Sequence, residues 1–348
     1  MPKTTEIPHG GNRPIGRRAF LRLSALGLAA AGAPTLSACG LGGGTGAFPT
    51  RPIQMIVAYE PGGGTDVGAR VLQPFLEEAL DGEVQIINLP GGGGWVGWND
   101  LVNADPDGYT IGFINTPNFM TGYLDPRLGR TDVGPESFTL IGNQVTDYGA
   151  IAVSPSDDRF DDITGFMEHA MEHELIVTST GVGSDDHFAS LQLSDRFDTR
   201  FTVLHNEGAA DSISDLLGGN VDAVFANVGE VKAQHDAGEI RVIAVMKDDA
   251  ERSPYLEDVP TLTEAGFTDV ASWSSRGIAA PAGLDPEVTA TLVDACRAAV
   301  EHPDHIEQLA TQGLEVDYLP PDEYADMVTR DDRTARRLGE TYIWGGAP

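Results

Sequence analysis

The chain has 348 residues, of which 41% are hydrophobic, so it can bury the core of one large domain or of two medium ones. Its 53 acidic and 22 basic residues give a formal net charge of −31 at pH 7. This charge argues against nucleic-acid binding, which needs a basic surface. The chain contains two cysteines, Cys39 and Cys296, and no disulfide is expected between them.

The first 38 residues have the layout of an export signal. The paired arginines Arg17 and Arg18 precede a moderately apolar run that is rich in leucine and alanine, which is typical of a twin-arginine signal peptide. This run is too short and too rich in alanine for a membrane span, which needs about 20 strongly apolar residues. LSAC, which ends at Cys39, resembles a lipobox, whose cysteine is lipidated and becomes the new N-terminus.

We therefore predict a signal peptide over residues 1–38, lipidation of Cys39, and a flexible tether over residues 39–50. The alternative is an ordinary signal peptide that is cleaved nearby. The lipid would anchor the exported protein to the outer face of the cytoplasmic membrane. Cys296 lies in the apolar sequence VTATLVDACRAAV, so we expect it to be a small buried side chain in a helix.

Short apolar segments alternate with amphipathic segments beyond the tether. Strands are predicted at IQMIVAY, VQIINLP and YTIGFINT, and the helices between them at residues 65–80 and 95–104. After FTLIGNQVTDYGAIAVSP the alternation starts again. Its predicted strands are LIVTST, FTVLHN, VDAVFAN and IRVIAVM, and its predicted helices cover residues 163–174, 185–197, 209–217 and 228–237.

This alternation predicts an α/β fold with two units, each with a mostly parallel sheet that is flanked by helices. The two units would form two lobes with a cleft between them. We expect residues 51–150 and 273–348 in lobe one and residues 151–272 in lobe two. The C-terminal helices, which would return to lobe one, are expected near residues 286–301, 305–312 and 321–338.

The segment IVAYEPGGGTDVGARV runs from a strand through three glycines into a helix. Glycine allows positive φ and a close approach of the backbone, and the free N–H groups of a helix start attract anions. Thr65 is expected to be the N-cap of this helix and Asp66 its first residue. A phosphate-binding loop is excluded, because that motif needs Gly-Lys-Ser/Thr where this chain has Gly68, Ala69 and Arg70. A simple corner between strand and helix remains the alternative.

A second glycine run, from Gly92 to Gly97, matches the dinucleotide-binding pattern G-x-G-x-x-G between a strand and a helix. That pattern also requires an acidic residue at the end of the next strand, where it binds the ribose. The next strand here ends at Thr116 and Pro117. We therefore expect no cofactor, and a secreted dinucleotide-dependent or hydrolytic enzyme that uses this loop is kept as the alternative function.

The segment from His169 to His173 reads H-x-x-E-H, a pattern found in some zinc proteases. Both histidines would lie on one face of a helix, but no third ligand is evident nearby, so an acidic, solvated helix is the better interpretation. The serine-hydrolase motif G-x-S-x-G is absent. No metal site and no catalytic residue are predicted.

Two later loops repeat the theme of the first glycine turn. TSTGVGSDDH and HNEGAADSISDLL each lead from a strand through small residues to a helix start. In the first of them Ser184 is expected to cap the helix, and Asp185 and Asp186 would interact favourably with its dipole. Several such loops at strand ends would line one cleft with backbone donors.

The order of these segments resembles the extracytoplasmic solute receptors of the tripartite tricarboxylate transporter family, the Bug receptors. The resemblance extends from Arg51 to Gly283. The segments that carry it are, in order, RPIQMIVAYEPGGGTD, PGGGGWVGWNDLVNADPDGYT, STGVGSDDHFASLQL, GAADSISDLLGGNVDAVFAN, RSPYLEDVPTLTEAG and SSRGIAAPAG.

The resemblance implies a two-lobed periplasmic-binding-protein fold of the type II, Venus-flytrap kind. It also implies a binding protein and not an enzyme. Such a receptor captures a small carboxylated metabolite, for example a di- or tricarboxylate, an amino acid or an aromatic acid, and delivers it to membrane permease subunits. A receptor that is coupled to another transporter class or to a sensor is an alternative. We expect a monomer.

Family loops match positions that would face the cleft and hold the carboxylate of the ligand through backbone N–H groups and small hydroxyls. Two asparagines near strand ends could add side-chain amides. The predicted binding residues are Tyr59, Gly63, Gly64, Thr65, Asp66, Asn118, Thr180, Gly181, Gly183, Ser184, Gly208, Ala209, Ala210 and Asn227.

Glu60 and Glu207 depart from the family, in which uncharged or basic residues are common at these places. An acidic side chain beside an anion site would repel the ligand or have a raised pKa. These residues indicate either acidification of the surface or a zwitterionic or amine-bearing ligand.

The acidic residues are spread over many short segments, as in proteins adapted to high salt. We predict that the thermal unfolding midpoint rises strongly between low and molar salt. At about 1 M salt the Debye length is only roughly 3 Å, so the self-repulsion of the acidic surface is screened. Unfolding followed by circular dichroism over a salt series checks this, and a midpoint that does not change with salt would contradict it.

Overall fold

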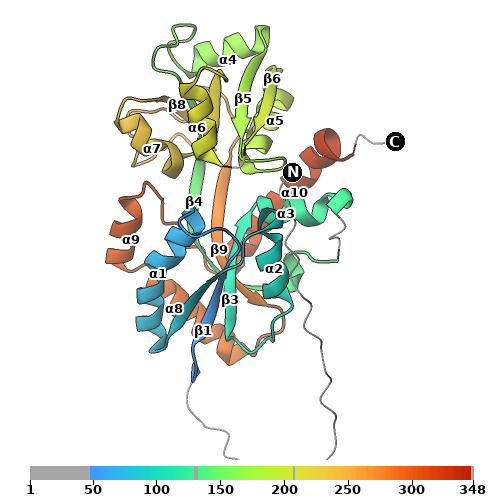
Figure 1. Ribbon diagram of the computed structural model, residues 1–348, viewed down its shortest axis with the longest axis vertical. Helices are drawn as coiled ribbons and strands as arrows, with labels where there is room; N and C mark the ends of the chain where they lie inside the picture. The colour runs from blue at the N-terminus through green and yellow to red at the C-terminus, as the bar shows by residue number, and fades with distance from the viewer. Residues whose placement is uncertain (1–47, 129–131, 207, 346–348) are drawn as a thin grey trace, which may run out of the picture. The chain divides into compact units, whose positions relative to one another are not determined.

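The computed structural model describes residues 48–128, 132–206 and 208–345. The predicted signal peptide, Cys39, most of the tether and Glu207 lie outside the described residues. The fold is mixed α/β with two lobes, as the sequence predicts. In Figure 1, lobe one is the lower half, with β1 and β3, and lobe two is the upper half, with β5 and β6. The residue boundaries expected for the lobes stay a prediction.

Lobe one contains three parallel strands in the order β2-β1-β3, with helices in the connections. Leu72, Leu76 and Leu80 recur every fourth residue along α1 and pack into the core of this lobe. The elements are β1 (Ile53–Val57), α1 (Gly64–Leu80), β2 (Val84–Asn88), α2 (Trp95–Val102), β3 (Thr110–Thr116) and α3 (Asn118–Leu124).

Lobe two repeats this arrangement with the parallel strands β7-β5-β6. Aromatic rings fill its core, since Phe201 stacks on Phe166 (6.0 Å between centroids) and meets Phe225 edge-on (5.5 Å). The elements are α4 (Ile163–Glu172), β5 (Leu175–Ser179), α5 (Asp185–Phe197), β6 (Phe201–His205), α6 (Ala209–Leu217), β7 (Ala223–Asn227), α7 (Val228–Asp236) and β8 (Arg241–Val245).

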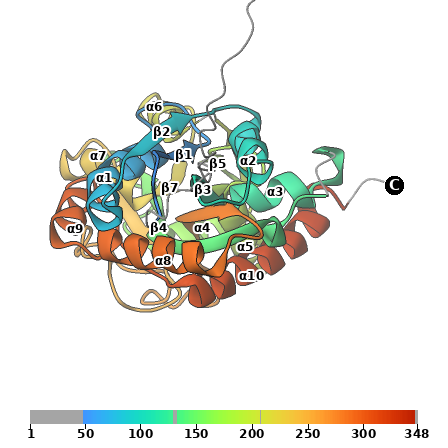
Figure 2. The same ribbon diagram turned by 90° about the horizontal axis from the view of Figure 1, so that it is seen from below.

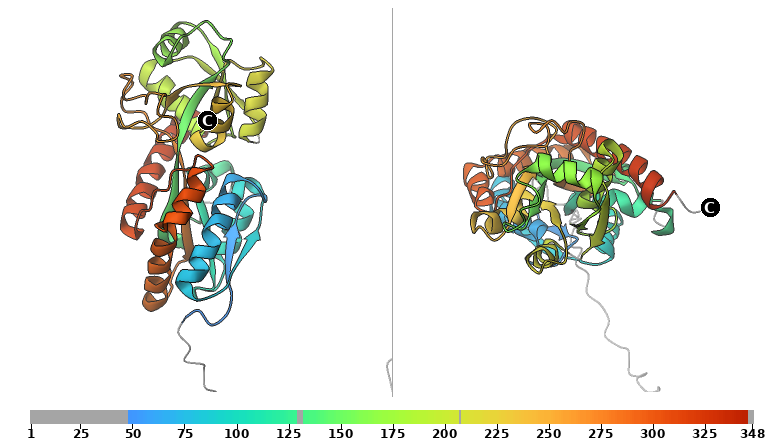
Figure 3. Two further views of the ribbon diagram at one scale, coloured as in Figure 1. Left: turned by 90° about the vertical axis from the view of Figure 1, so that its left-hand side faces the viewer. Right: turned by 90° about the horizontal axis from the view of Figure 1, so that it is seen from above.

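Two long strands, β4 (Phe138–Val153) and β9 (Trp273–Pro281), join the lobes. They pair with each other antiparallel. β9 also pairs with β3 of lobe one, and β4 also pairs with β7 and β8 of lobe two. The strands of both lobes therefore belong to one continuous sheet that is antiparallel in its middle. Figures 1 and 3 show the two strands running from one half of the molecule to the other.

The C-terminal helices are α8 (Pro286–Val300), α9 (Pro303–Ala310) and α10 (Pro321–Leu338). α8 packs against α1 and β4, and α10 packs against β4 and α3 and also contacts α5 of lobe two. Figure 2 shows α8 and α10 along one side of the molecule. Cys296 is buried in α8, as expected. Within the described ranges, no helix has both the length and the apolar character that a bilayer span needs.

The start of α1 differs from the prediction that Thr65 is the N-cap of this helix and Asp66 its first residue. The N-cap residue is Gly63, and the helix starts directly after it. The Thr65 hydroxyl accepts a hydrogen bond from Asn115 Nδ2 of β3 (2.8 Å), and Asp66 Oδ2 accepts one from Gly62 N–H (2.8 Å). Both side chains hold the turn in place, so the first N–H groups of α1 have no side-chain cap.

The start of α5 confirms its prediction. Ser184 is the N-cap residue, and its hydroxyl accepts a hydrogen bond from His187 N–H (3.2 Å). Asp185 and Asp186 occupy the first turn, where the helix dipole stabilises negative charge. This helix therefore begins and ends where local sequence signals place it.

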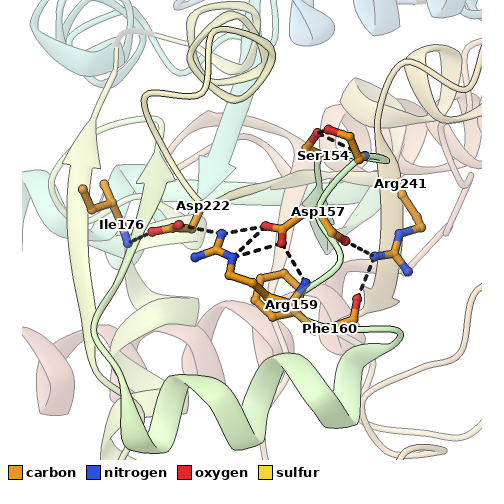
Figure 4. Close-up of polar contacts among 8 residues, drawn as sticks. Ser154, Asp157, Arg159, Phe160, Ile176, Asp222 and Arg241 are labelled. Atoms are coloured by element: carbon orange, nitrogen blue, oxygen red, sulfur yellow. Dashed lines mark hydrogen bonds and ion pairs between the residues drawn. The ribbon is translucent and has the colours of Figure 1, made fainter.

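A polar network in lobe two fixes the loop between β4 and α4 (Figure 4). Arg159 in this loop forms ion pairs with Asp157 (2.6 Å) and Asp222 (2.7 Å). Asp222 also accepts a hydrogen bond from a backbone N–H of β5 (2.7 Å), and Arg241 of β8 donates to the carbonyl of Phe160 (2.8 Å). The hydrogen bond from Arg159 lowers the pKa of the Asp157 carboxyl. The network ties the loop to the sheet of lobe two.

We predict that Asp222→Asn destabilises the protein by about 1 kcal/mol, because the ion pair with Arg159 is lost while the amide oxygen can still accept from β5. The measurement is the free energy of unfolding from a urea titration. Asp294→Asn is the matched control, since Asp294 pairs with Arg297 on α8 where both side chains are more than half exposed (71% and 55%). Equal decreases in the free energy of unfolding for the two variants would contradict the prediction.

Candidate functional site

The carboxyl ends of the parallel strands of both lobes meet near the middle of β4. Thr116, the last residue of β3, pairs with Ser275 of β9, which pairs in turn with Thr146 of β4. Asn227, the last residue of β7, pairs with Gly149 of β4, three positions further along. Ligands of open α/β sheets bind beyond the carboxyl ends of the strands. This lobe junction is therefore the candidate site.

An ion pair between Asp147 and Arg276 lies at the lobe junction. Arg276 Nη2 donates to Asp147 Oδ2 (3.2 Å), and the two residues are only 5% and 1% exposed, respectively. The Asp147 carboxylate also accepts from Gly229 N–H (3.1 Å) in α7. Asn227 Nδ2 donates to the Asp147 carbonyl (3.0 Å) and to the Asp185 carboxylate (2.8 Å). The pair thus connects β4 and β9 to the starts of α5 and α7.

The start of α1 in lobe one lies against the Arg276 guanidinium. A Cβ added to Gly64 would be 3.0 Å from Arg276 Nη2 and 3.2 Å from its Cζ, so a larger residue at this position would crowd the guanidinium. Tyr59, which follows β1, faces the same charges. Burial and then the Asp185 charge raise the pKa of the Tyr59 hydroxyl, and Arg276 opposes the shift. Groups from both lobes therefore converge on Arg276.

Three carboxyl groups, those of Asp147, Asp185 and Glu230, interact electrostatically with the Arg276 guanidinium, and a fourth, Asp186, follows Asp185 in α5. Burial raises the pKa of Asp147 to about 6, with Arg276 opposing the shift, and burial raises the pKa of Glu230 to about 7. The pKa of Asp185 is raised by burial, and that of Asp186 by burial and by the neighbouring Asp185 charge. The lobe junction therefore holds more acidic groups than one guanidinium can neutralise.

A cavity of about 190 Å³ lies between the second glycine run, α3 and the loop that follows β5. A hydrogen bond connects the two lobes here, because the hydroxyl of Thr121 in α3 donates to the Gly183 carbonyl (2.6 Å). Gly183 has a φ of 79°, and a Cβ added there would be 2.4 Å from Thr121. The cavity lining includes Gly92, Gly93, Trp95, Asn118, Leu128, Thr180, Gly181 and Ser184.

The structure brings many of the predicted binding residues to the lobe junction. Tyr59, Gly64 and Asn227 lie at the ion pair. Residues 180–184 and Asn118 lie at the 190 Å³ cavity. Strand ends of both lobes supply these residues, as the repeated strand–glycine–helix pattern suggests.

Other predicted binding residues have different surroundings. The Asp66 carboxylate holds the glycine turn and accepts hydrogen bonds from Arg70 (2.8 Å) and Asn88 (2.9 Å). Gly208 is the N-cap residue of α6, and Ala209 and Ala210 begin this helix. The carbonyls of Gly208 and Ala210 accept hydrogen bonds from within it. In the described part of the chain, residues 208–210 form no hydrogen bond with Arg276 or with the groups that contact it.

Sequence reasoning missed Asp147 and Arg276, and it assigned Asp185 only to the helix start. The available signal was a charged residue inside an apolar strand, since Asp147 interrupts FTLIGNQVTDYGAIAV and Arg276 interrupts SSRGIAAPAG. A charge buried in a strand is costly unless it is paired. Such residues can be found from the sequence, but their partners cannot.

The H-x-x-E-H segment lies at the C-terminal end of α4. The ring of His169 on α4 lies 4.6 Å from the ring of His173, which is the C-cap residue just after that helix. Across the described ranges, no group of three or more potential ligands is arranged to hold a metal ion. A larger cavity of about 390 Å³ lies between α5 and α10, and its walls include Asp185, Trp273 and Asp331.

Known proteins share this architecture. The family model described as the tripartite tricarboxylate transporter family receptor matches residues 68–340. The UPF0065 protein in the tcbD-tcbE intergenic region of Pseudomonas sp. (strain P51) is 30% identical and aligns over 84% of this chain and 86% of its own. A TctC solute binding protein from Polaromonas has a crystal structure with a TM-score of 0.73 and 30% identity, covering 84% of this chain and 99% of that one. The structure of MatC from Rhodopseudomonas palustris with bound malate has a TM-score of 0.68 and 23% identity. It covers 84% of this chain and 99% of the MatC chain.

Two lobes that share a pair of long strands, with helix starts from both lobes at their junction, define a solute-binding protein. The chain belongs to the tripartite tricarboxylate transporter receptor family. Protein BugT of Bordetella pertussis is 28% identical over 84% of this chain and 90% of its own, and the resemblance to the Bug receptors is confirmed. Members of this family are extracytoplasmic substrate-binding receptors and not enzymes.

We predict that Asp186→Asn stabilises the protein more at pH 8 than at pH 5. The pKa of Asp186 is raised in the folded state, first by burial, so the stability that this group contributes below its unfolded pKa is lost as the pH rises through the folded pKa. Asparagine removes this charge, and its amide oxygen can still accept from Thr180. The measurement is the difference in unfolding midpoint between variant and wild type at the two pH values.

Asp198→Asn is the control for this prediction. Asp198 is exposed at the left-handed C-cap of α5 (φ 57°), a conformation that asparagine tolerates. The difference in unfolding midpoint between Asp198→Asn and wild type should be small and equal at the two pH values. A difference for Asp186→Asn that does not grow with pH would contradict the prediction.

Proposed function

We propose that this protein captures a small carboxylated metabolite between its lobes and delivers it to the membrane permease subunits of a tripartite tricarboxylate-type transporter. The observation that carries the proposal is the contact between the start of α1 and Arg276 at the lobe junction. Backbone N–H groups of a helix start and a guanidinium both suit a carboxylate. The malate held by MatC belongs to the same chemical class.

The ligand carboxylate would lie at the start of α1, where residues 64–66 supply backbone N–H groups and Thr65 its hydroxyl, while the Gly63 N–H donates to the Glu60 carbonyl. Residues 180–184 and 208–210 would approach from lobe two as the lobes close around the ligand. Asn118 would add a side-chain amide, while Asn227 would position Asp185, because both hydrogens of its Nδ2 are donated to Asp147 and Asp185. We expect no cofactor and no catalytic residue in this site.

The location of the receptor is also a proposal. We infer export by the twin-arginine route from Arg17 and Arg18, and a lipid anchor at Cys39 from the lipobox-like sequence before it. A monomer on the outer face of the cytoplasmic membrane could present its ligand to the permease directly. Globomycin-sensitive processing or mass spectrometry of the mature N-terminus would test the anchor.

We predict that small carboxylates or amino acids raise the unfolding temperature of the mature protein in molar salt. A ligand at 100 times its dissociation constant stabilises the folded state by about 2.7 kcal/mol. A thermal-shift screen with carboxylic acids, amino acids and dinucleotides is the measurement. A response to a dinucleotide alone would contradict the receptor function and favour an enzyme that uses the second glycine run.

Gly64→Ala tests where the ligand binds. Its added methyl group would be 3.0 Å from Arg276 Nη2 and would crowd the start of α1, so we predict binding at least about tenfold weaker. Gly165→Ala in α4 is the matched control, because the nearest atom to its added Cβ is 3.4 Å away and φ is not strained. Equal ligand affinity in both variants would place the ligand elsewhere.

A further inference from the structure

Arg276 leaves part of its guanidinium unused. Nη2 donates to Asp147, but Nη1 is buried and has no hydrogen-bond partner among the residues that the structure describes. Nη1 is 3.4 Å from the position of a Cβ on Gly64, so it lies beside the first turn of α1. A buried donor without a partner costs free energy unless a ligand supplies an acceptor. The donor fork of an arginine matches the geometry of a carboxylate.

Polar groups of lobe one beside Arg276 are also only partly used. Asn115 pairs with Arg276 across β3 and β9 and is 4% exposed. Its Nδ2 donates to Thr65 Oγ1 (2.8 Å), while its Oδ1 is buried without a partner in the described ranges. The Thr65 hydroxyl accepts this bond and keeps its own proton to donate. The lobe junction thus offers donors for a carboxylate and an acceptor for a donor group next to it.

The acidic side of the lobe junction lacks positive charge. Asp147, Asp185 and Glu230 interact electrostatically with Arg276, and Asp186 interacts with Asp185 and Glu230. Within the described part of the chain, Asp147 alone among these four forms an ion pair. Asp186 is fully buried, and its Oδ1 has no hydrogen-bond partner there. Buried carboxylates need a cation or further hydrogen bonds to offset their loss of hydration. A ligand that brings a cationic group would supply what the protein does not.

We propose that this receptor is specific for α-amino acids, an inference that deepens the proposed receptor function and rests on it. The ligand carboxylate binds Nη1 of Arg276 beside the first turn of α1, and the guanidinium moves away from its contact with Gly64 to admit it. The ammonium group, on the adjacent carbon, lies toward Asn115 Oδ1 and the carboxyl groups of Asp147 and Asp185. An acid of the same skeleton without the ammonium group would bring its negative charge to the same carboxyl groups with nothing to offset them.

Succinate, malate and aspartate test this inference, because they share one four-carbon skeleton and carry hydrogen, hydroxyl or ammonium at one carbon. Propionate, lactate and alanine repeat the comparison on a shorter skeleton. A thermal-shift screen of the proteinogenic amino acids comes first, and calorimetric titration of the mature protein in molar salt then gives the affinities. We expect an amino acid to bind at least about tenfold tighter than the matching unsubstituted acid, with the hydroxy acid between them.

Two variants test separately how the site binds the carboxylate and the ammonium group of the ligand. Arg276→Lys keeps a positive charge beside Asp147 but lacks the second donor arm beside α1, so amino-acid binding should weaken by about tenfold or more. Asp185→Asn keeps an oxygen that can accept from Asn227 but removes a charge, so the preference for aspartate over succinate should shrink. The control Arg297→Gln removes an arginine on α8 whose side chain is 55% exposed and should change neither value.

The outcomes distinguish this inference from the receptor function itself. Unfolding midpoints without ligand first establish that each variant is folded, and each variant reports on the inference independently of the other. Unsubstituted acids that bind as tightly as amino acids would overturn the amino-acid specificity and leave the receptor function in place. Site variants that both behave like the control would also overturn the specificity alone. Binding of no carboxylate and no amino acid at millimolar concentration would overturn both.

Discussion

The buried ion pair between Asp147 and Arg276 lies at the centre of the molecule, because its residues belong to the two strands, β4 and β9, that join the lobes. Removing two charges from water costs several kcal/mol per ion, which their attraction and further hydrogen bonds must offset. Here Gly229 N–H adds a hydrogen bond to Asp147, and the start of α1 covers the guanidinium. The parallel strands of both lobes end beside this pair, so the site follows from the same arrangement.

The lobes are joined continuously by β4 and β9 and by weaker contacts elsewhere. Thr121 of lobe one donates to the Gly183 carbonyl of lobe two, and Arg337 of α10 pairs with Asp195 of α5. The latter side chains are 55% and 38% exposed, and such surface pairs contribute about 0–1 kcal/mol. A hinge motion about the two strands would therefore break few polar interactions, but it would also separate Phe188 of α5 from the core cluster of lobe one. This balance suits a binding protein, since the site must open to admit a ligand while each lobe keeps its core.

Local patterns predicted much of the fold. α5, α6 and α10 have the predicted bounds, because capping residues or a proline mark their starts and apolar residues recur at helical spacing. The extent of β4 was not predicted, since a long run of mostly apolar residues does not reveal that one strand serves two lobes. The cap assigned to Thr65 was wrong because Asn115, fifty positions away on β3, binds the hydroxyl instead.

Spacing and composition were enough to establish the alternation of strands and helices, the glycine turns at their junctions, the acidic character of the chain and its resemblance to a family. They could not show that Asp147, Asp185 and Arg276 share one site, which became visible only in the folded chain. Strand register and the two passages of the chain between the lobes bring these residues together. No local pattern encodes that register, because it depends on pairing between segments more than a hundred residues apart.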